Sequence, residues 1–268
     1  MVPDDDEDAA SAGRSSRRSL LTRAAGITAV ALVAGGGTAA VVGQRDAGAG
    51  RLVDRSVASE TGGPTTARVL WRARTSELVL ALTFDDGPVE RWTRPLLELL
   101  TNERVPATFC VVGQRVLEQA DLVRRELSGL HELANHSFDH PDLSTLAAHE
   151  VREQLGRTDE AVHRLTGQRT SLVRPPFGRL SGTVLEVAAQ SGHDLLLWDR
   201  ELHEKSESSA QNAAHVLGGL QPGMVLLAHD GGPGPHQVGL AALPEVIRGA
   251  RARGYRFVTA SELFSLHK

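Results

Sequence analysis

Cysteine is almost absent from this chain of 268 residues, in which Cys110 is the only one. A single cysteine excludes an internal disulfide and any zinc or iron–sulfur site built from several thiolates. A metal site would therefore need histidine, aspartate or glutamate ligands. Lysine is scarce too, since Lys205 and Lys268 are the only two among the 29 basic residues.

An excess of positive charge is also missing. The formal net charge is −4 and the isoelectric point is about 6.3. Because proteins bind nucleic acid chiefly by neutralising its phosphates with basic side chains, this balance excludes nucleic acid as the main partner. Hydrophobic residues make up 41% of the chain and charged residues 23%, which is typical of a soluble globular protein with a sizeable core.

Residues 1–49 resemble an export signal. Arg17 and Arg18 are followed by Ser19-Leu20-Leu21, as in a twin-arginine signal. An uncharged stretch rich in Ala, Val and Gly then covers residues 26–43, and residues 47–49 offer a small-residue cleavage site. We expect export by the twin-arginine route to the cell envelope or the extracellular space. The alternative is an uncleaved single-pass anchor, so membrane contact is expected only through this segment.

The rest of the chain divides at about residue 75. Residues 50–74 carry Gly, Ser, Thr, Pro and Arg without apolar periodicity, which predicts a flexible linker. Over residues 75–268, short apolar runs alternate with amphipathic stretches, which predicts a single α/β catalytic domain. The predicted strands are 78–84, 107–112, 131–134, 171–174, 194–198, 224–228 and 257–259, and the predicted helices are 95–101, 116–127, 147–165, 184–190, 210–220 and 240–253.

About seven parallel strands, each followed by a helix, predict a barrel-like domain with its chemistry at the carboxyl ends of the strands. Polar residues stand at four of these ends: Asp85 and Asp86, then His136 and His140, then Arg174, then His229. Each segment alone has an ordinary interpretation, such as a solvated Asp-Gly-Pro turn, a surface histidine pair or a rim histidine. Together they point to one rim of one barrel.

This combination of residues predicts metal chemistry. One aspartate and two histidines form a three-ligand site that leaves coordination positions open. A second aspartate, an arginine and a third histidine then remain for moving protons. His229, at the tip of an apolar strand, could be a general acid. Arg174, which precedes two prolines, could pair rigidly with a carboxylate.

Four motifs in this order resemble the polysaccharide deacetylase family, also called the NodB-homology family or carbohydrate esterase family four. The motifs are Thr83-Phe84-Asp85-Asp86-Gly87, His136-Ser137-x-x-His140, Arg174-Pro175-Pro176-Phe177 and Leu227-x-His229, and the resemblance spans residues 78 to about 264. It implies a distorted (β/α) barrel that removes acetyl groups from N- or O-acetylated sugars with the help of a metal ion.

The resemblance also implies roles for individual residues. It puts one divalent metal ion on Asp86, His136 and His140, the catalytic base on Asp85 and the acid on His229. The expected ion is zinc, although the same ligands would hold cobalt or nickel.

Other residues are expected to support this chemistry. Arg174 would pair with Asp85 and hold its orientation. A backbone N–H near Phe177 would stabilise the oxyanion. Leu227 lies two residues before His229 on the same strand face and could line a pocket for the acetyl methyl group. Trp92 is either a stacking platform for a sugar ring or a packing residue of the first loop.

One segment departs from the family pattern. The family usually has an Asp-Trp pair after the fifth strand, whose aspartate orients the catalytic histidine and whose tryptophan walls the groove. By spacing, Glu204 and Lys205 stand at these positions. We expect Glu204 to orient His229, with Glu201 and Asp199 as rivals, and the missing tryptophan leaves the groove wall in doubt.

Three functions fit these residues. The first is a monomeric deacetylase acting on an acetylated polysaccharide or oligosaccharide, with peptidoglycan, chitin and xylan as possible polymers. The second is a ferrous oxygenase, because two histidines and one carboxylate also bind that iron, but it leaves Asp85, Arg174 and His229 without a role. The third is a sugar-binding module of the same fold with weak or no turnover.

Overall fold

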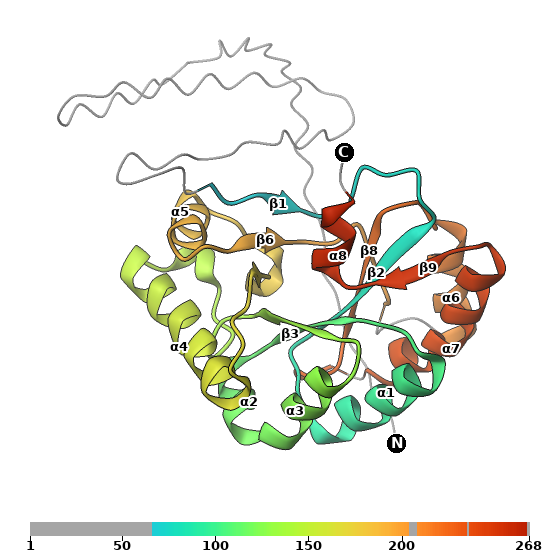
Figure 1. Ribbon diagram of the computed structural model, residues 1–268, viewed down its shortest axis with the longest axis horizontal. Coiled ribbons are helices and arrows are strands. Elements are labelled where there is room, and N and C mark those ends of the chain that lie inside the picture. The colour runs from blue at the N-terminus through green and yellow to red at the C-terminus, as the bar shows by residue number, and fades with distance from the viewer. Residues whose placement is uncertain (1–65, 204–207, 235, 267–268) are drawn as a thin grey trace, which may run out of the picture. The chain divides into compact units, whose positions relative to one another are not determined.

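The computed structural model describes residues 66–203, 208–234 and 236–266, so the expected export signal lies outside the described residues. Parallel strands alternate with helices along this part of the chain (Figure 1). The strands are β1 (Val69–Leu70), β2 (Val79–Asp85), β3 (Thr108–Val111), β4 (Glu132–Asn135), β5 (Leu172–Val173), β6 (Asp194–Leu196), β7 (Arg200–Glu201), β8 (Met224–His229) and β9 (Arg256–Val258).

The helices follow the strands in chain order. They are α1 (Glu90–Glu103), α2 (Gly113–Glu118), α3 (Ala120–Ser128), α4 (Ala148–Thr166), α5 (Gly182–Gln190), α6 (Ser209–Gly218), α7 (Gln237–Ala252) and α8 (Ala260–Ser265), with single 3₁₀ turns at Leu143–Thr145 and Pro176–Gly178. Figure 1 shows α1 to α7 around the outside of the strands, with α8 beside the first half of β2.

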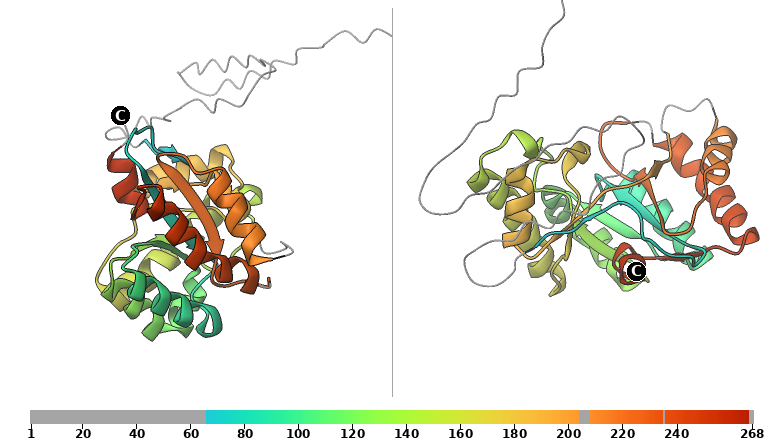
Figure 2. Two further views of the ribbon diagram at one scale, coloured as in Figure 1. Left: turned by 90° about the vertical axis from the view of Figure 1, so that its right-hand side faces the viewer. Right: turned by 90° about the horizontal axis from the view of Figure 1, so that it is seen from above.

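All the strands belong to one sheet, and every pairing between named strands is parallel. The order is β1-β6-β5-β4-β3-β2-β8-β7, with β9 paired to the first half of β2. The sheet curls so that the helices cover its outer face (Figures 1 and 2). The predicted distorted (β/α) barrel is therefore confirmed.

The pleat of β2 divides its side chains between two cores. Leu80, Leu82 and Phe84 belong to the core under the helices, whereas Val79 and Ala81 belong to the core inside the curve of the sheet. Successive side chains of a strand point to opposite faces. The inner face of β2 therefore continues through residue 83 to residue 85, so its polar end belongs to the interior of the barrel.

The seven predicted strands all form, and two short strands join them. β1 and β7 have two residues each, which is too short to show any periodicity in the sequence. β1 falls inside residues 50–74, where a linker is predicted, and pairs with β6. The single helix predicted over 116–127 is divided at Gln119, whose φ of −124° and ψ of 42° are not helical.

None of the helices in the described part of the chain has both the length and the apolar character needed to cross a membrane.

Packing between α4 and the sheet gives a prediction about stability. Leu155 of α4 is fully buried against Val173, Val184 and Leu195. Leu155→Ala should lower the free energy of unfolding by about 2–5 kcal/mol, because a cavity replaces the lost side chain. Urea denaturation measures this loss. Leu117, which is 61% exposed, is the matched control, and an equal loss in Leu117→Ala would contradict this packing.

Candidate active site at the carboxyl ends of the strands

Side chains alternate between the two faces of each strand, and this alternation places polar side chains inside the barrel. Asp85 ends β2 and His229 ends β8, and the two residues are directly paired across these strands. On β5, Leu172 belongs to the inner core, so residue 174 points inward as well. The predicted base, acid and arginine therefore come from three strands to one end of the barrel.

The Asp86 side chain also lies at this end of the barrel, but an unusual backbone conformation places it there. In an extended chain, residues 85 and 86 would point to opposite faces of the sheet. Asp86 instead has a φ of 69°, in the left-handed region that few non-glycine residues adopt. The Arg115 guanidinium donates a hydrogen bond to the Asp86 carbonyl. An ideal Cβ on Gly232 would lie 2.4 Å from Asp86 Oδ2, so the opposite loop packs tightly against this carboxylate.

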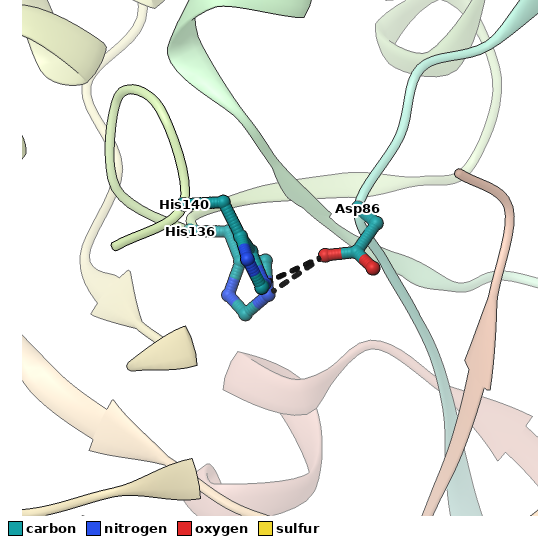
Figure 3. Close-up of side chains that lie close together, drawn as sticks. All are labelled: Asp86, His136 and His140. Atoms are coloured by element: carbon teal, nitrogen blue, oxygen red, sulfur yellow. Dashed lines mark ion pairs between the residues drawn. The ribbon is translucent and has the colours of Figure 1, made fainter. Parts of the chain in front are cut away.

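Asp86, His136 and His140 form the predicted ligand set (Figure 3). Asp86 Oδ1 lies 3.0 Å from His140 Nε2 and 3.3 Å from His136 Nε2. One ligand atom from each residue lies within 4.8 Å of the other two. This is the only such group of three that histidine, cysteine, aspartate and glutamate form among the described residues.

The donor set fits a divalent cation. His136 Nδ1 lies 2.6 Å from the Arg174 carbonyl oxygen. A carbonyl oxygen only accepts hydrogen bonds, so Nδ1 carries a proton and Nε2 is left to face Asp86. A backbone contact of this kind fixes a metal-binding histidine in many proteins.

Charge balance around these groups agrees with this fit. Burial opposes ionisation of Asp86, but hydrogen bonds and positive charge from His136 and His140 outweigh it, so the pKa of Asp86 lies well below its ordinary value. Burial likewise opposes a charge on His136, but Asp85 and Asp86 outweigh it and raise the pKa of that imidazole. A divalent cation at the same place would stabilise these carboxylates in the same way as positive charge on the histidines.

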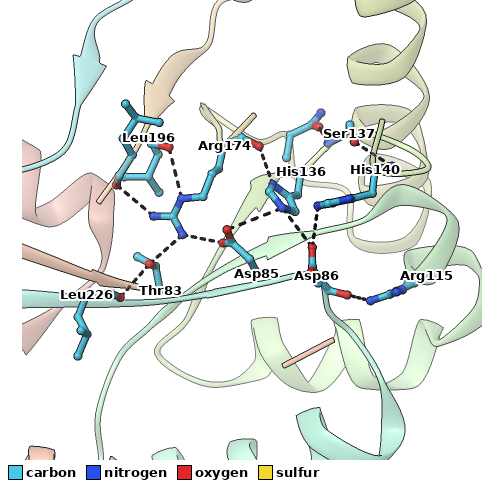
Figure 4. A network of polar contacts seen from close by, with 12 residues as sticks. Thr83, Asp85, Asp86, Arg115, His136, Ser137, His140, Arg174, Leu196 and Leu226 are labelled. Atoms are coloured by element: carbon cyan, nitrogen blue, oxygen red, sulfur yellow. Dashed lines mark hydrogen bonds and ion pairs between the residues drawn. The ribbon is translucent and has the colours of Figure 1, made fainter. Parts of the chain in front are cut away.

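A fully buried arginine holds Asp85 (Figure 4). Arg174 Nη1 donates hydrogen bonds to Asp85 Oδ1 at 2.6 Å and to Thr83 Oγ1 at 2.9 Å. The remaining nitrogens of Arg174 donate to the carbonyl oxygens of Leu196 and Leu197, at 3.3 and 3.2 Å. The predicted pairing of Arg174 with Asp85 is present in the structure, and it fixes one carboxylate oxygen of Asp85.

These groups open into a cavity of about 370 Å³. Its lining residues are Asp85, Asp86, His136, His140, Phe177, Trp198, Glu201, Leu227, His229 and Pro233. Phe177 is 59% exposed, and its ring meets His140 edge-on, with centroids 4.9 Å apart. Leu227 is only 2% exposed, on the inner face of β8, two residues before His229.

Two predicted site residues in the described part of the chain, Arg174 and Trp92, are not among those that line this cavity. Trp92 packs edge-on against His236, with ring centroids 5.6 Å apart, and carries the Arg91 guanidinium over its own ring. Its role in binding sugar stays a prediction. Glu204 lies outside the described residues. Of its rivals, Asp199 pairs with Arg72, whereas Glu201 lines the cavity and lies 3.2 Å from His203.

A buried carboxyl group next to the predicted acid has no counterpart in the sequence analysis. Asp230 is fully buried and accepts a hydrogen bond of 2.5 Å from Thr93 Oγ1. Burial is the main cause that raises the pKa of Asp230 to about 7, and the charges of Asp86 and Asp85 add to it. An ideal Cβ on Gly87 would lie 2.4 Å from this carboxylate, which explains why glycine follows the aspartate pair.

Trp198 also lines the cavity, although no role in the site was predicted for it from the sequence. The alternation of side chains could have predicted its position, because residue 198 stands two positions after Leu196 of the inner core and so shares its face. The benzo edge of Trp198 packs against Gly178, where an ideal Cβ would lie 2.8 Å from the ring.

The buried ion pair leads to a prediction. Arg174→Met should lower the free energy of unfolding by about 3–5 kcal/mol, because Asp85 is left buried without its cation. Chemical denaturation followed by circular dichroism measures the change. Arg164→Met is the control, since Arg164 and Glu160 form an exposed pair on α4 that should contribute under about 0.5 kcal/mol. Equal stability of Arg174→Met and the parent protein would contradict a stabilising ion pair between Arg174 and Asp85.

Comparison with known proteins gives consistent matches. The family described as polysaccharide deacetylase matches residues 72–196. The peptidoglycan-N-acetylglucosamine deacetylase PgdA of Listeria monocytogenes is 34% identical over 194 residues, which are 72% of this chain but only 40% of the relative's length. A peptidoglycan-N-acetylglucosamine deacetylase of Bacillus cereus is 32% identical over 203 residues, covering 74% of this chain and 93% of the relative.

A solved structure agrees with these relatives. The crystal structure of the Bc1960 peptidoglycan N-acetylglucosamine deacetylase superposes with a TM-score of 0.71 at 30% sequence identity, over 75% of this chain and 94% of that one. The resemblance seen in the four sequence motifs is therefore confirmed: the chain belongs to the polysaccharide deacetylase family, carbohydrate esterase family four.

Proposed function

We propose that this protein is a metal-dependent hydrolase that removes acetyl groups from an N- or O-acetylated polysaccharide. One observation carries the proposal: the Asp86–His136–His140 group shares a single cavity with Asp85 and His229. The names of the relatives favour peptidoglycan as the polymer.

In this proposal Asp86, His136 and His140 hold one divalent cation, with zinc the expected ion and cobalt or nickel as alternatives. A cation bound there would polarise the acetyl carbonyl and lower the pKa of a water molecule. The chain itself supports the arrangement, because the two imidazole Nε2 atoms and Asp86 Oδ1 converge and His136 is fixed through its other nitrogen.

The proton transfers belong to the other two groups. Asp85 accepts the proton of the attacking water, and His229 returns a proton to the nitrogen or oxygen that leaves as acetate is released. Arg174 is a positioning residue, because its guanidinium binds Asp85 Oδ1 and leaves Oδ2 for the reaction. Leu227 and Phe177 line the cavity and would receive the acetyl methyl group.

A second candidate is a sugar-binding module of the same fold with weak or no turnover. It is favoured by Glu204 and Lys205, which stand where the family usually has an Asp-Trp pair. Measuring acetate release distinguishes the two candidates, because only the deacetylase releases acetate.

Acetate release from a panel of acetylated glycans tests the main proposal. We expect release from peptidoglycan fragments or N-acetylglucosamine oligomers, loss of release with a chelator, and recovery when the cation is added back. Binding of these glycans without acetate release would favour the sugar-binding module. Activity that a chelator leaves intact would overturn the metal-dependent mechanism.

Variants should separate the cation ligands from the base. Asp86→Ala, His136→Ala and His140→Ala should each lose the cation, measured by elemental analysis of the purified protein, together with activity. Asp85→Asn should keep the cation and lose about 10²–10⁴-fold in kcat, because only the proton acceptor is removed. If Asp85→Asn releases the cation instead, the two aspartates have the opposite roles.

Localisation is a separate proposal that rests on the sequence. Export by the twin-arginine route predicts that the double variant Arg17→Lys, Arg18→Lys stays in the cytoplasm as precursor, as seen by fractionation and immunoblotting. Unchanged export of this variant would exclude that route.

A further inference from the structure

The loop of residues 136–140, which carries both predicted histidine ligands, has an unusual backbone. Ser137 and His140 have φ values of 64° and 63°, in the left-handed region that few residues other than glycine adopt. Conformations of this kind cost free energy and persist only where the surrounding structure fixes them. The groups that hold this loop therefore decide where the imidazoles of His136 and His140 lie.

Hydrogen bonds connect this loop to the end of β4. The Ser137 hydroxyl accepts from the backbone N–H of His140 at 3.1 Å (Figure 4). The backbone N–H of Ser137 donates in turn to Asn135 Oδ1 at 2.9 Å. Because Asn135 is fully buried, its side-chain oxygen is a fixed point from which the loop begins.

Helix α4 holds the other end of the Asn135 amide. Asn135 Nδ2 donates to the Leu155 carbonyl oxygen and to Asp159 Oδ1, both at 2.9 Å. A primary amide has two N–H donors and one carbonyl oxygen, and here each of these groups has a partner. The contact with α4 therefore fixes which way the amide points, with its oxygen toward Ser137.

A second contact between α4 and the loop is direct. Gln154 Oε1 accepts from the backbone N–H groups of Phe138 and Asp139, at 2.9 and 3.2 Å. Phe138 and Asp139 lie between the two predicted ligands in the chain. One side chain of α4 thus fixes the middle of the loop, while Asp159 acts at its start.

Asp159 is itself held by a polar cluster away from the active-site cavity. Thr170 Oγ1 donates to Asp159 Oδ1 at 2.6 Å, and His193 Nε2 lies 3.3 Å from Asp159 Oδ2. Burial opposes the charge of Asp159, but His193, Thr170 and Asn135 outweigh it and lower the pKa of this carboxyl group. Asp159 is therefore ionised at neutral pH and is a strong acceptor for the Asn135 amide.

We propose that Gln154 and Asp159 are positioning residues, which hold the loop of residues 136–140 in the conformation that presents both imidazoles to Asp86. They would thereby set the affinity of this site for its cation. Neither side chain lines the active-site cavity, so both act only through the loop. The inference rests on the proposed deacetylase function, because it assigns the support of that enzyme's cation site.

Zinc titration of the full chain, stripped of metal with a chelator, tests the proposal. Gln154→Ala and Asp159→Ala should each raise the dissociation constant for Zn²⁺ about tenfold, measured by competition with a fluorescent indicator, because removal of groups that orient metal-binding histidines weakens metal binding. At saturating zinc, kcat should change little. Gln154→Glu and Asp159→Asn, which keep an acceptor oxygen, should recover part of the affinity. Unchanged dissociation constants in both alanine variants would overturn the proposal.

Two control variants separate positioning from general stability. Glu160 forms an exposed pair with Arg164 on α4, so Glu160→Ala should bind zinc as the parent protein does. Ile247 of α7 is buried in the core under the helices, so Ile247→Ala should lower the midpoint of urea unfolding without weakening zinc binding. If Ile247→Ala raises the zinc dissociation constant as much as Asp159→Ala does, the positioning role is wrong.

Hydrogen exchange in the metal-free protein separates this inference from the proposed function. The amides of Ser137 and His140 donate the hydrogen bonds that fix the loop, so NMR should show them exchanging about tenfold faster in Asp159→Ala than in the parent protein. Exchange in Glu160→Ala should match the parent. If the parent protein binds no zinc and releases no acetate, the deacetylase proposal fails, and these two amides still decide whether α4 holds the loop. Unchanged exchange of both amides would overturn that role.

Discussion

The whole site depends on one buried guanidinium. Arg174 is fully buried. Asp85 balances its charge, and the guanidinium also donates hydrogen bonds to the carbonyl oxygens of Leu196 and Leu197 at the end of β6. Its own carbonyl oxygen accepts the hydrogen bond from His136. One residue thus orients both the predicted base and a predicted cation ligand. A buried charge is costly unless several partners satisfy it, so the positions of these partners are linked to each other.

The aspartate pair is held from the opposite side by close backbone packing. The left-handed backbone of Asp86 turns its carboxylate toward the two histidines. Gly87 lies against Asp230 and Gly232 against Asp86, with no room for a Cβ at either glycine. Adjacent residues can therefore do different work: Asp85 faces the arginine, and Asp86 faces the histidines. Tight packing of this kind converts a costly conformation into a fixed ligand geometry.

The segment after the fifth predicted strand is where this chain differs from the family pattern, because Glu204 and Lys205 stand at the positions of the usual Asp-Trp pair. Trp198 and Glu201 belong both to the active-site cavity and to a second hollow beside it.

Sequence alone determined the family, the barrel and the set of polar strand ends. Apolar runs such as residues 224–228 predict strands because their length and flanking turns are local properties, and four ordered motifs are specific enough to identify the family. The roles of Asp85, Asp86, His136, His140 and His229 stay predictions that the proposed variants test.

Tertiary structure decided what depends on contacts between distant segments. β1 and β7 form only because a neighbouring strand offers hydrogen bonds, so two residues without periodicity become strands. Asp230 is an ordinary turn residue in the sequence, and it becomes a buried carboxyl only when α1 and the β2 loop close over it. Glu201 becomes a neighbour of Leu227 through the register of β7 on β8, and Trp198 lines the same cavity as both. Register and burial are properties of the packed sheet, and no local pattern in the chain encodes them.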